Sequence, residues 1–177
     1  MHPHVERILL TKEEIAVIVD RLGKTITKDY ADKNLLVVGV LTGGTIFAAD
    51  LIRSIDLDCE LDFVGVSSYG NTAQSGDLTW TKPLSLSPKG KDVLVIEDIL
   101  DTGRTLSCLT AYLQEAGANS VKLCVMLDKP ECRIADITAD YVGHSVGNEF
   151  IVGYGLDYAQ QYRNLPYIGV LKPEQYQ

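Results

Sequence analysis

Short hydrophobic runs and longer stretches of helical spacing alternate along the chain. The runs at residues 35–41, 92–96 and 120–127 are rich in β-branched and aliphatic residues, which is typical of strands buried on both faces of a parallel sheet. A further strand pattern covers residues 60–67. Because strands and helices alternate in this order, the pattern predicts an α/β fold with a doubly wound, mostly parallel sheet flanked by helices.

Helical spacing of hydrophobic residues marks three segments, one before these strands and two between them. The first helix is expected to begin after Thr11, because Thr11 and Glu14 have the spacing of a capping box. Its hydrophobic positions fall on one face and are Ile15, Ile18, Val19, Leu22 and Ile26. Two more helices are expected at residues 46–52 and 106–114. Each helix would pack its hydrophobic face on the sheet.

Length and composition predict a single domain over residues 1–177. The 177 residues are 46% hydrophobic, which suffices for a substantial core, and the longest uncharged hydrophobic stretches are too short to cross a bilayer. The first residues lack the pattern of a signal peptide, so we expect a cytoplasmic protein that does not bind membranes. The four cysteines show no metal-ligand spacing and are expected to be reduced.

The net charge of −8 narrows the range of expected partners. It argues against binding of nucleic acid, because long nucleic acids need a broad surface of cations to neutralise their phosphates. A small phosphorylated ligand, held at one local site with the help of Mg²⁺, remains compatible with this charge.

The segment 97–105 carries the strongest sign of chemistry. Two carboxylates, Glu97 and Asp98, follow a predicted strand, and the small-residue turn Asp101-Thr102-Gly103-Arg104-Thr105 precedes a predicted helix. The N–H groups at a helix start and the threonine hydroxyls can surround a phosphate. The carboxylates can accept hydrogen bonds from sugar hydroxyls or hold a hydrated Mg²⁺. The segment therefore indicates a phosphorylated sugar as ligand.

A second turn, rich in glycine, follows the strand at 35–41. The turn Thr42-Gly43-Gly44-Thr45 leads directly into the helix expected at 46–52, so it can form a second anion site. Paired glycines could instead let the helix pack tightly on its strand, and the phosphate motif is what favours the anion site.

Two further segments follow strands and can lie near these turns. Residues 68–81 are polar, contain glycine and lack periodicity, which is typical of a long loop; a solvent-exposed hairpin is the alternative. Lys129 comes just after the strand at 120–127 and is followed by a proline. It would lie over the carboxyl edge of the sheet, or serve as a solvated strand end.

Two sequence motifs resemble a known family. Residues 96–105, IEDILDTGRT, resemble the phosphoribosyl-pyrophosphate motif of the type I phosphoribosyltransferases. Residues 149–171, EFIVGYGLDYAQQYRNLPYIGVL, resemble the C-terminal hood of the hypoxanthine-guanine phosphoribosyltransferases. With the LTGG, SYG and DKP segments, the resemblance covers nearly the whole chain from residue 35 onward. It implies a core of about residues 8–128 and a hood of about residues 129–177 with the N-terminal residues.

The resemblance implies a role for each matching position. The ribose and 5′-phosphate of the sugar donor would be bound by Glu97, Asp98, Asp101, Thr102, Gly103, Arg104 and Thr105. Its pyrophosphate would be bound by Thr42, Gly43, Gly44 and Arg163. The purine would be bound by Lys129, Phe150, Ile151 and Asp157. The metal Mg²⁺ would be held by Glu97, Asp98 and Asp157, and a lid over the site would open with Ser68 and Tyr69.

The activity that the resemblance implies is a reaction of purine salvage. The enzyme would transfer the 5-phosphoribosyl group from 5-phosphoribosyl 1-diphosphate to hypoxanthine, and to guanine, giving IMP or GMP and pyrophosphate. Asp101 is the expected catalytic base that accepts the proton from purine N7, with helix capping as its alternative role. Family members form homodimers or homotetramers. The alternatives are an RNA-binding pyrimidine-operon regulator with uracil phosphoribosyltransferase activity and a xanthine-preferring enzyme.

The chain departs from the family at one position of the pyrophosphate loop. Thr42 stands where purine-salvage members commonly carry Lys or Arg. The backbone donors would survive this change, and the Thr42 side chain is left with a role in pyrophosphate binding or in subunit contacts. The resemblance also implies a non-proline cis peptide between Leu41 and Thr42. For Arg133, both a catalytic and a structural role are open.

Overall fold

Two sheets organise the part of the chain that the structure describes. The computed structural model describes residues 1–68 and 78–176. The main sheet has six strands in the order β4-β3-β2-β5-β6-β7. In chain order these strands are β2 (Leu35–Leu41), β3 (Glu60–Ser68), β4 (Leu78–Lys82), β5 (Asp92–Leu100), β6 (Ser120–Asp128) and β7 (Tyr141–Ser145).

The main sheet is parallel except at one edge. Strand β2 pairs in parallel with both β3 and β5, β5 pairs with β6, and β6 pairs with β7. Only β4 runs antiparallel, against β3. The sequence-based expectation of a mostly parallel α/β sheet is therefore confirmed. Because the five parallel strands share one direction, their carboxyl ends meet at the same edge of the sheet.

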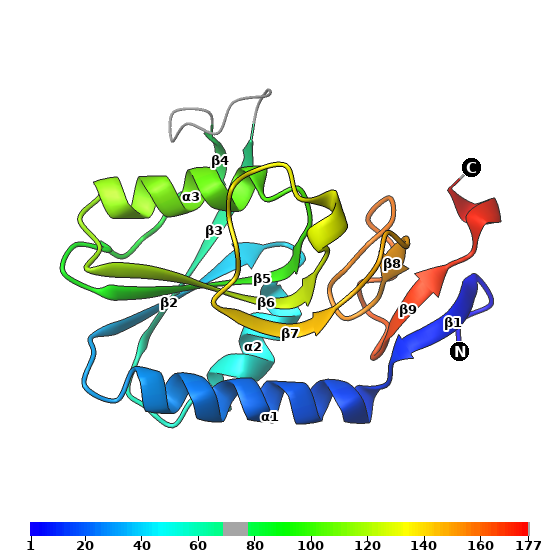
Figure 1. Cartoon of the computed structure of the whole chain (residues 1–177), viewed down its shortest axis with the longest axis horizontal. Helices are drawn as coiled ribbons and strands as arrows, with labels where there is room; N and C mark the ends of the chain where they lie inside the picture. The colour runs from blue at the N-terminus through cyan, green and yellow to red at the C-terminus, as the bar shows by residue number, and fades with distance from the viewer. Residues whose placement is uncertain (69–77, 177) are drawn as a thin grey trace.

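Helices cover both faces of this sheet (Figure 1). Helices α1 (Lys12–Asp29) and α2 (Thr45–Ile52) lie on one face, and α3 (Arg104–Glu115) lies on the other. Alternate residues of the central strands supply the two halves of the core: Leu94 and Ile96 pack toward α1 and α2, whereas Val93 and Val95 pack toward α3. The predicted capping box between Thr11 and Glu14 is present at the start of α1.

The hood is a small antiparallel sheet beside the carboxyl edge of the main sheet (Figure 1). Its strands are β1 (Val5–Leu10), β9 (Ile168–Leu171) and β8 (Ile151–Val152), in the spatial order β1-β9-β8. The N-terminal strand β1 pairs with β9 in this small sheet. Strand β7, which follows residue 128, pairs with β6 in the main sheet.

Two local expectations are corrected by strand pairing. The strand predicted at 92–96 continues as β5 to Leu100, because Ile99 and Leu100 pair with β6 residues Leu127 and Asp128. The long loop expected at 68–81 ends earlier, because residues 78–82 form β4 against β3. The remainder of that segment, 69–77, lies outside the described residues.

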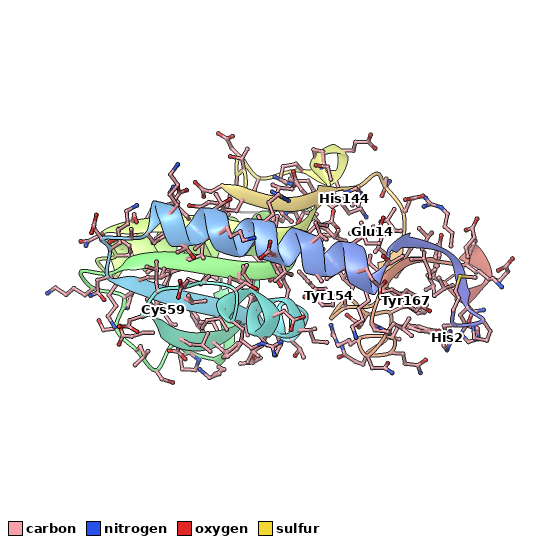
Figure 2. The ribbon with its side chains drawn as sticks, turned by 90° about the horizontal axis from the view of Figure 1, so that it is seen from below. His2, Glu14, Cys59, His144, Tyr154 and Tyr167 are labelled. Carbon is pink, nitrogen blue, oxygen red and sulfur yellow. The ribbon has the colours of Figure 1, made fainter. Side chains whose placement is uncertain are left out.

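Helix α1 lies in front of the main sheet when the molecule is viewed from the side of this helix (Figure 2). His2 and Tyr167 lie in the hood at one end of this view, and Cys59 lies toward the other end. The four cysteines are all free thiols. Across the described ranges, no helix is both long and apolar enough to cross a membrane. Two short 3₁₀ helices, η2 (Pro130–Cys132) and η3 (Pro173–Gln175), complete the described elements.

Candidate active site

The two adjacent carboxylates lie near the carboxyl end of β5, where the hood meets the main sheet. Glu97 is half-buried and its Oε1 accepts a hydrogen bond from the Asp98 N–H at 3.0 Å. Asp98 is buried, with 9% of its surface exposed. Its carboxylate lies against the backbone of Gly43, where an added Cβ would come within 1.9 Å of Oδ2. Only glycine at position 43 permits the turn after β2 to approach strand β5 this closely.

Burial perturbs the protonation of this pair. It raises the pKa of Glu97 well above its usual range, the negative charge of Asp98 adds to the shift, and hydrogen bonds from the Asp98 and Gly44 N–H groups oppose it. Burial also raises the pKa of Asp98, although the Glu97 side chain, the Ile99 N–H and the charge of Arg163 act in the opposite direction. Two adjacent carboxylates that are shielded from water in this way favour a bound cation, which would stabilise both as anions.

The turn Asp101–Thr105 lines a cavity of about 230 Å³. Helix α3 begins directly after Gly103, which is its N-cap residue and has a φ of +79°. That conformation is accessible to glycine and disfavoured for other residues. The start of a helix carries the positive end of its dipole, so this turn suits a phosphate. Because Gly103 is the cap, the alternative capping role of Asp101 is wrong.

The cavity joins the phosphate turn to the two carboxylates. Its lining also includes hydrophobic residues of the neighbouring strands, so a ligand there would be shielded on one side. The complete lining is Val40, Leu41, Val66, Glu97, Asp98, Ile99, Leu100, Asp101, Thr102, Gly103, Arg104, Thr105 and Leu106. Within the described part of the chain, the Arg104 Nε atom is buried without a hydrogen-bond partner. An unpaired buried donor of this kind is costly unless an acceptor binds to it.

The glycine turn after β2 lies beside the acidic pair, because Gly43 packs against the Asp98 carboxylate. The peptide bond between Leu41 and Thr42 is cis, which confirms that prediction. The N–H groups of Gly44 and Thr45 donate within the turn, to Val40 O at 3.1 Å and Thr42 O at 3.3 Å. The N–H groups of Thr42 and Gly43 are therefore the first candidates to donate to an external anion. The Thr42 side chain is exposed.

The hood brings an ion pair to the same place. Arg163 Nη2 lies 2.9 Å from Asp157 Oδ1, and Arg163 Nη1 donates to Gly155 O at 2.7 Å. A Cβ added to Gly155 would come within 2.1 Å of Gly43 O, so the loop that carries this pair touches the glycine turn. Charges of both Arg163 and Asp157 act on the pKa of Asp98. The pair is therefore part of the carboxylate site, with side-chain exposures of 22% and 26%.

Three of the four residues expected at the purine lie close together, whereas Asp157 belongs to the ion pair with Arg163. Lys129 follows β6, is 9% exposed, and donates from Nζ to Glu149 O at 3.0 Å. Phe150 is 36% exposed and stacks on Tyr176, with ring centroids 4.7 Å apart. Ile151 is buried in β8. Lys129 and Phe150 are thus neighbours, although they are 21 positions apart in the sequence.

The expected lid residues are described only in part. Ser68 is the last residue of β3, and Tyr69 lies outside the described residues.

The donor set fits a magnesium ion that takes most of its ligands from substrate and water. In the described ranges, no three His, Cys, Asp or Glu side chains converge on one point. Glu97 and Asp98 nevertheless form an adjacent acidic pair, and burial is the main cause that raises the pKa of both. Mg²⁺ is commonly held by one or two carboxylates, with the rest of its ligands from phosphates and water. Asp157 forms an ion pair with Arg163 and would have to exchange that partner to bind a metal.

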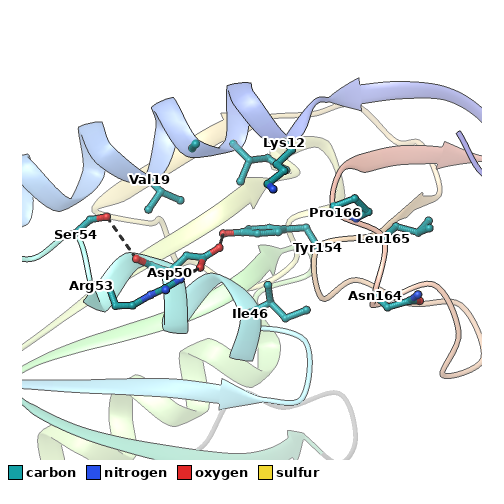
Figure 3. A pocket seen from close by; sticks show the side chains of 12 residues that line it. Lys12, Val19, Ile46, Asp50, Arg53, Ser54, Tyr154, Asn164, Leu165 and Pro166 are labelled. Atoms are coloured by element: carbon teal, nitrogen blue, oxygen red, sulfur yellow. Dashed lines mark hydrogen bonds and ion pairs between the residues drawn. The ribbon is translucent and has the colours of Figure 1, made fainter.

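A second, larger cavity of about 460 Å³ lies between α1, α2 and residues 164–166 (Figure 3). It contains none of the residues expected at the site. Three of its polar side chains bind one another: the Tyr154 hydroxyl donates to Asp50 Oδ2 at 2.8 Å, and Arg53 pairs with Asp50 Oδ1. The perturbed carboxylates and the phosphate turn line the smaller cavity, so that cavity is the candidate active site.

Sequence reasoning missed two aromatic side chains that shape this site and left the role of Arg133 open. Tyr158 and Tyr176 pack on Phe150, edge-on at 5.3 Å and stacked at 4.7 Å. Arg133 contacts the outer side of the phosphate turn. No periodicity distinguishes these residues; the only sequence signal was their proximity to the recognised segments.

Comparison with known proteins agrees with this geometry. Residues 6–159 match the family model of the phosphoribosyl transferase domain. The chain is 51% identical over 177 residues to a hypoxanthine-guanine phosphoribosyltransferase of Staphylococcus aureus, a match that covers 99% of each protein. It is 52% identical over 177 residues to the bifunctional protein TilS/HprT of Listeria monocytogenes, but spans only 27% of that longer protein.

The likeness extends to a solved structure. A crystal structure of a hypoxanthine phosphoribosyltransferase from Staphylococcus aureus superposes with a TM-score of 0.95 at 50% identity, covering 100% of this chain and 97% of that one. The sequence motifs, the fold and the arrangement of the two anion turns around the acidic pair agree with these matches. The chain therefore belongs to the phosphoribosyl transferase family, and within it to the hypoxanthine-guanine phosphoribosyltransferases.

Proposed function

We propose that this protein transfers the 5-phosphoribosyl group from 5-phosphoribosyl 1-diphosphate to hypoxanthine, and to guanine, giving IMP or GMP and pyrophosphate. The observation that carries the proposal is the cavity in which the acidic pair Glu97 and Asp98 and the phosphate turn Asp101–Thr105 face one space. The glycine turn lies against the Asp98 carboxylate, and the loop that carries the Asp157–Arg163 pair touches that turn through Gly155. The names of the full-length relatives support the choice of substrates.

Each part of the donor has a matching group. The 5′-phosphate would bind the N–H groups at the start of α3, the Thr102 hydroxyl and the buried Arg104 Nε. Ribose hydroxyls would donate to Glu97 and Asp98. The pyrophosphate would accept hydrogen bonds from the glycine turn and from Arg163. Binding at both ends of the donor orients the bond that breaks, which converts binding energy into rate.

Magnesium fits between the acidic pair and the donor. Glu97 and Asp98 would hold Mg²⁺, with Asp157 as a further ligand. When bound, Mg²⁺ would supply positive charge for the pyrophosphate as it leaves. The residues of the chain contribute independently to the same barrier, because Arg163 and the turn N–H groups stabilise the developing negative charge.

Asp101 is proposed as the catalytic base. Asp101 is exposed and lines the cavity, and it is not required as the cap of α3. It would accept the proton from purine N7 as the base attacks the ribose carbon, a contribution of about 10²- to 10⁴-fold. Closure of the segment that begins at Ser68 and Tyr69 would exclude water from the reacting sugar.

Selection of 6-oxopurines would come from Lys129 and Phe150. The Lys129 ammonium donates to Glu149 O, next to Phe150, and this contact supports a role for Lys129 as donor to a purine carbonyl. The Phe150 ring would stack on the base, and Ile151 would contact its edge through the backbone. Adenine would meet this donor with an amino group, which is itself a donor, so it would bind poorly.

Initial rates with four bases test the proposal. Hypoxanthine, guanine, xanthine and adenine are each compared at saturating donor and Mg²⁺. We expect hypoxanthine and guanine to exceed adenine by at least about 10³-fold. A rate highest with xanthine would support the xanthine-preferring enzyme, and transfer to uracil with salt-sensitive RNA binding would support the regulator. Absence of transfer to any purine would contradict the proposal.

Assembly and location are proposed separately. We expect a homodimer or homotetramer, which sedimentation equilibrium measures directly, and a cytoplasmic enzyme that binds neither membranes nor nucleic acid.

A further inference from the structure

The outer side of the phosphate turn is covered by the segment 133–137, which follows η2. Ile134 and Ala135 N–H groups both donate to Thr102 O at 3.0 Å. A Cβ added to Gly103 would come within 2.6 Å of Ile137 Cγ2 and within 2.9 Å of Arg133 Cδ. The turn is thus tightly packed on the side that faces away from the cavity.

Arg133 donates from all three of its side-chain nitrogen atoms. Nε donates to Asp101 O at 2.8 Å, Nη2 donates to Leu100 O at 3.1 Å, and Nη1 donates to Ile137 O at 2.6 Å. Nη2 also pairs with Asp128 Oδ1 at the end of β6. The side chain is 15% exposed, and Asp128 is 19% exposed. The guanidinium is therefore occupied by protein groups, which excludes it as the direct ligand of a substrate in this arrangement.

The direction of these carbonyl groups determines where the amides of the turn point. In a planar trans peptide, the C=O of one residue and the N–H of the next point in opposite directions. Arg133 holds the C=O groups of Leu100 and Asp101, and the following residues hold that of Thr102. The N–H groups of Asp101, Thr102 and Gly103 must then point away from Arg133, on the side of the turn where the cavity lies.

We propose that Arg133, held by Asp128, is a positioning residue for the 5′-phosphate: it orients the turn so that its N–H groups face the phosphate. This inference rests on the proposed function, since it assigns the turn to a phosphate monoester. A planar guanidinium is needed because it reaches separate acceptors at fixed angles, whereas the lysine ammonium is a single point charge. Because Arg133 binds the C=O groups of both Leu100 and Asp101, it fixes the peptides on either side of Asp101. Arg133 would therefore also orient the proposed catalytic base.

Arg133→Lys is the variant that tests this role. It retains the positive charge for Asp128 but cannot hold the Leu100 and Asp101 carbonyl groups together. Calorimetry compares its affinity for ribose 5-phosphate, which carries only the phosphate monoester, with its affinity for Mg²⁺-pyrophosphate, which does not use the turn. We expect the affinity for ribose 5-phosphate to fall about tenfold or more, and the affinity for pyrophosphate to change less than about twofold.

Arg21→Lys is the matched control. Arg21 also donates to two backbone carbonyl groups, Val142 O at 3.1 Å and Gly143 O at 2.9 Å, but it joins α1 to β7 away from the cavity. We expect this variant to bind both ligands as the unaltered protein does. If Arg133→Lys does not fold, Asp128→Asn tests the same hold more gently, because it removes only the charge that pairs with Arg133. About a threefold selective loss for ribose 5-phosphate is then expected.

Three outcomes overturn the inference in distinguishable ways. Equal losses for ribose 5-phosphate and pyrophosphate would make Arg133 a general structural residue. Unchanged binding of both ligands by a folded Arg133→Lys would show that the turn needs no such hold. If the unaltered protein bound pyrophosphate but not ribose 5-phosphate, the assignment of the turn, and with it this part of the proposed function, would be wrong.

Discussion

Replacing Gly43 by alanine tests whether the site depends on the close approach of the glycine turn to Asp98 in strand β5. A Cβ at position 43 would come within 1.9 Å of Asp98 Oδ2 and 2.7 Å of its Cγ, whereas real Cβ atoms essentially never come closer than 3.0 Å to another heavy atom. The Asp98 carboxylate must therefore move by roughly 1 Å, which is the smallest shift that relieves such a contact. That carboxylate is a proposed ligand of both ribose and Mg²⁺.

The size of the effect follows from this displacement. Misplacing a positioning group by about 1 Å costs about 10²-fold in rate, which corresponds to about 2.7 kcal/mol of lost transition-state stabilisation. We expect kcat/KM for the donor to fall about 10²-fold in Gly43→Ala. The free energy of unfolding should fall by only about 1 kcal/mol, because the clash involves the mobile end of a side chain.

Steady-state kinetics with varied donor and saturating hypoxanthine, together with thermal unfolding, measure both quantities. Gly147→Ala is the control, since a Cβ there would meet no atom within 4 Å. In an Asp98→Ala background the clashing atoms are absent, so adding Gly43→Ala should cost little more. If Gly43→Ala kept kcat/KM within about threefold of the unaltered protein, or if the two substitutions were simply additive, the reasoning would be refuted.

Three further predictions follow from single residues. Asp101→Asn should lower kcat by about 10²- to 10⁴-fold with little change in donor KM, because it removes the proposed base; unchanged turnover in rapid-mixing assays would exclude that role. Thr42→Ala should change donor KM less than about threefold, because the exposed side chain is not needed by backbone donors, and a loss beyond about tenfold would contradict this. Burial alone would raise the pKa of Asp62, but hydrogen bonds from three backbone N–H groups and Lys82 lower it below its usual value of 3.8. The Asp62 carboxylate therefore stabilises the folded protein above its unfolded-state pKa, and this stabilisation is lost as the pH falls through its folded-state pKa. Between about pH 6 and pH 3, the melting temperature of Asp62→Asn should fall less than that of the unaltered protein. Parallel curves of melting temperature against pH would disprove this role of Asp62.

Local pattern was sufficient for most elements of the fold. The hydrophobic runs identified the buried strands, and the Thr11 capping box marked the start of α1, because each depends on residues close together in sequence. The errors fell where a distant partner decides the outcome. Strand β5 extends to Leu100 because β6 pairs with it, and residues 78–82 form a strand because β3 offers an edge.

The site divides in the same way. The sequence by itself determined the two anion turns and the acidic pair, since a strand followed by small residues and a helix start has the same chemistry wherever it occurs. Only the tertiary structure decided that Gly155 touches Gly43, that Arg133 holds the phosphate turn, and that the Asp157–Arg163 pair acts on Asp98. Those contacts join segments far apart in the chain. They depend on how closely backbones approach, which no local spacing of residues encodes.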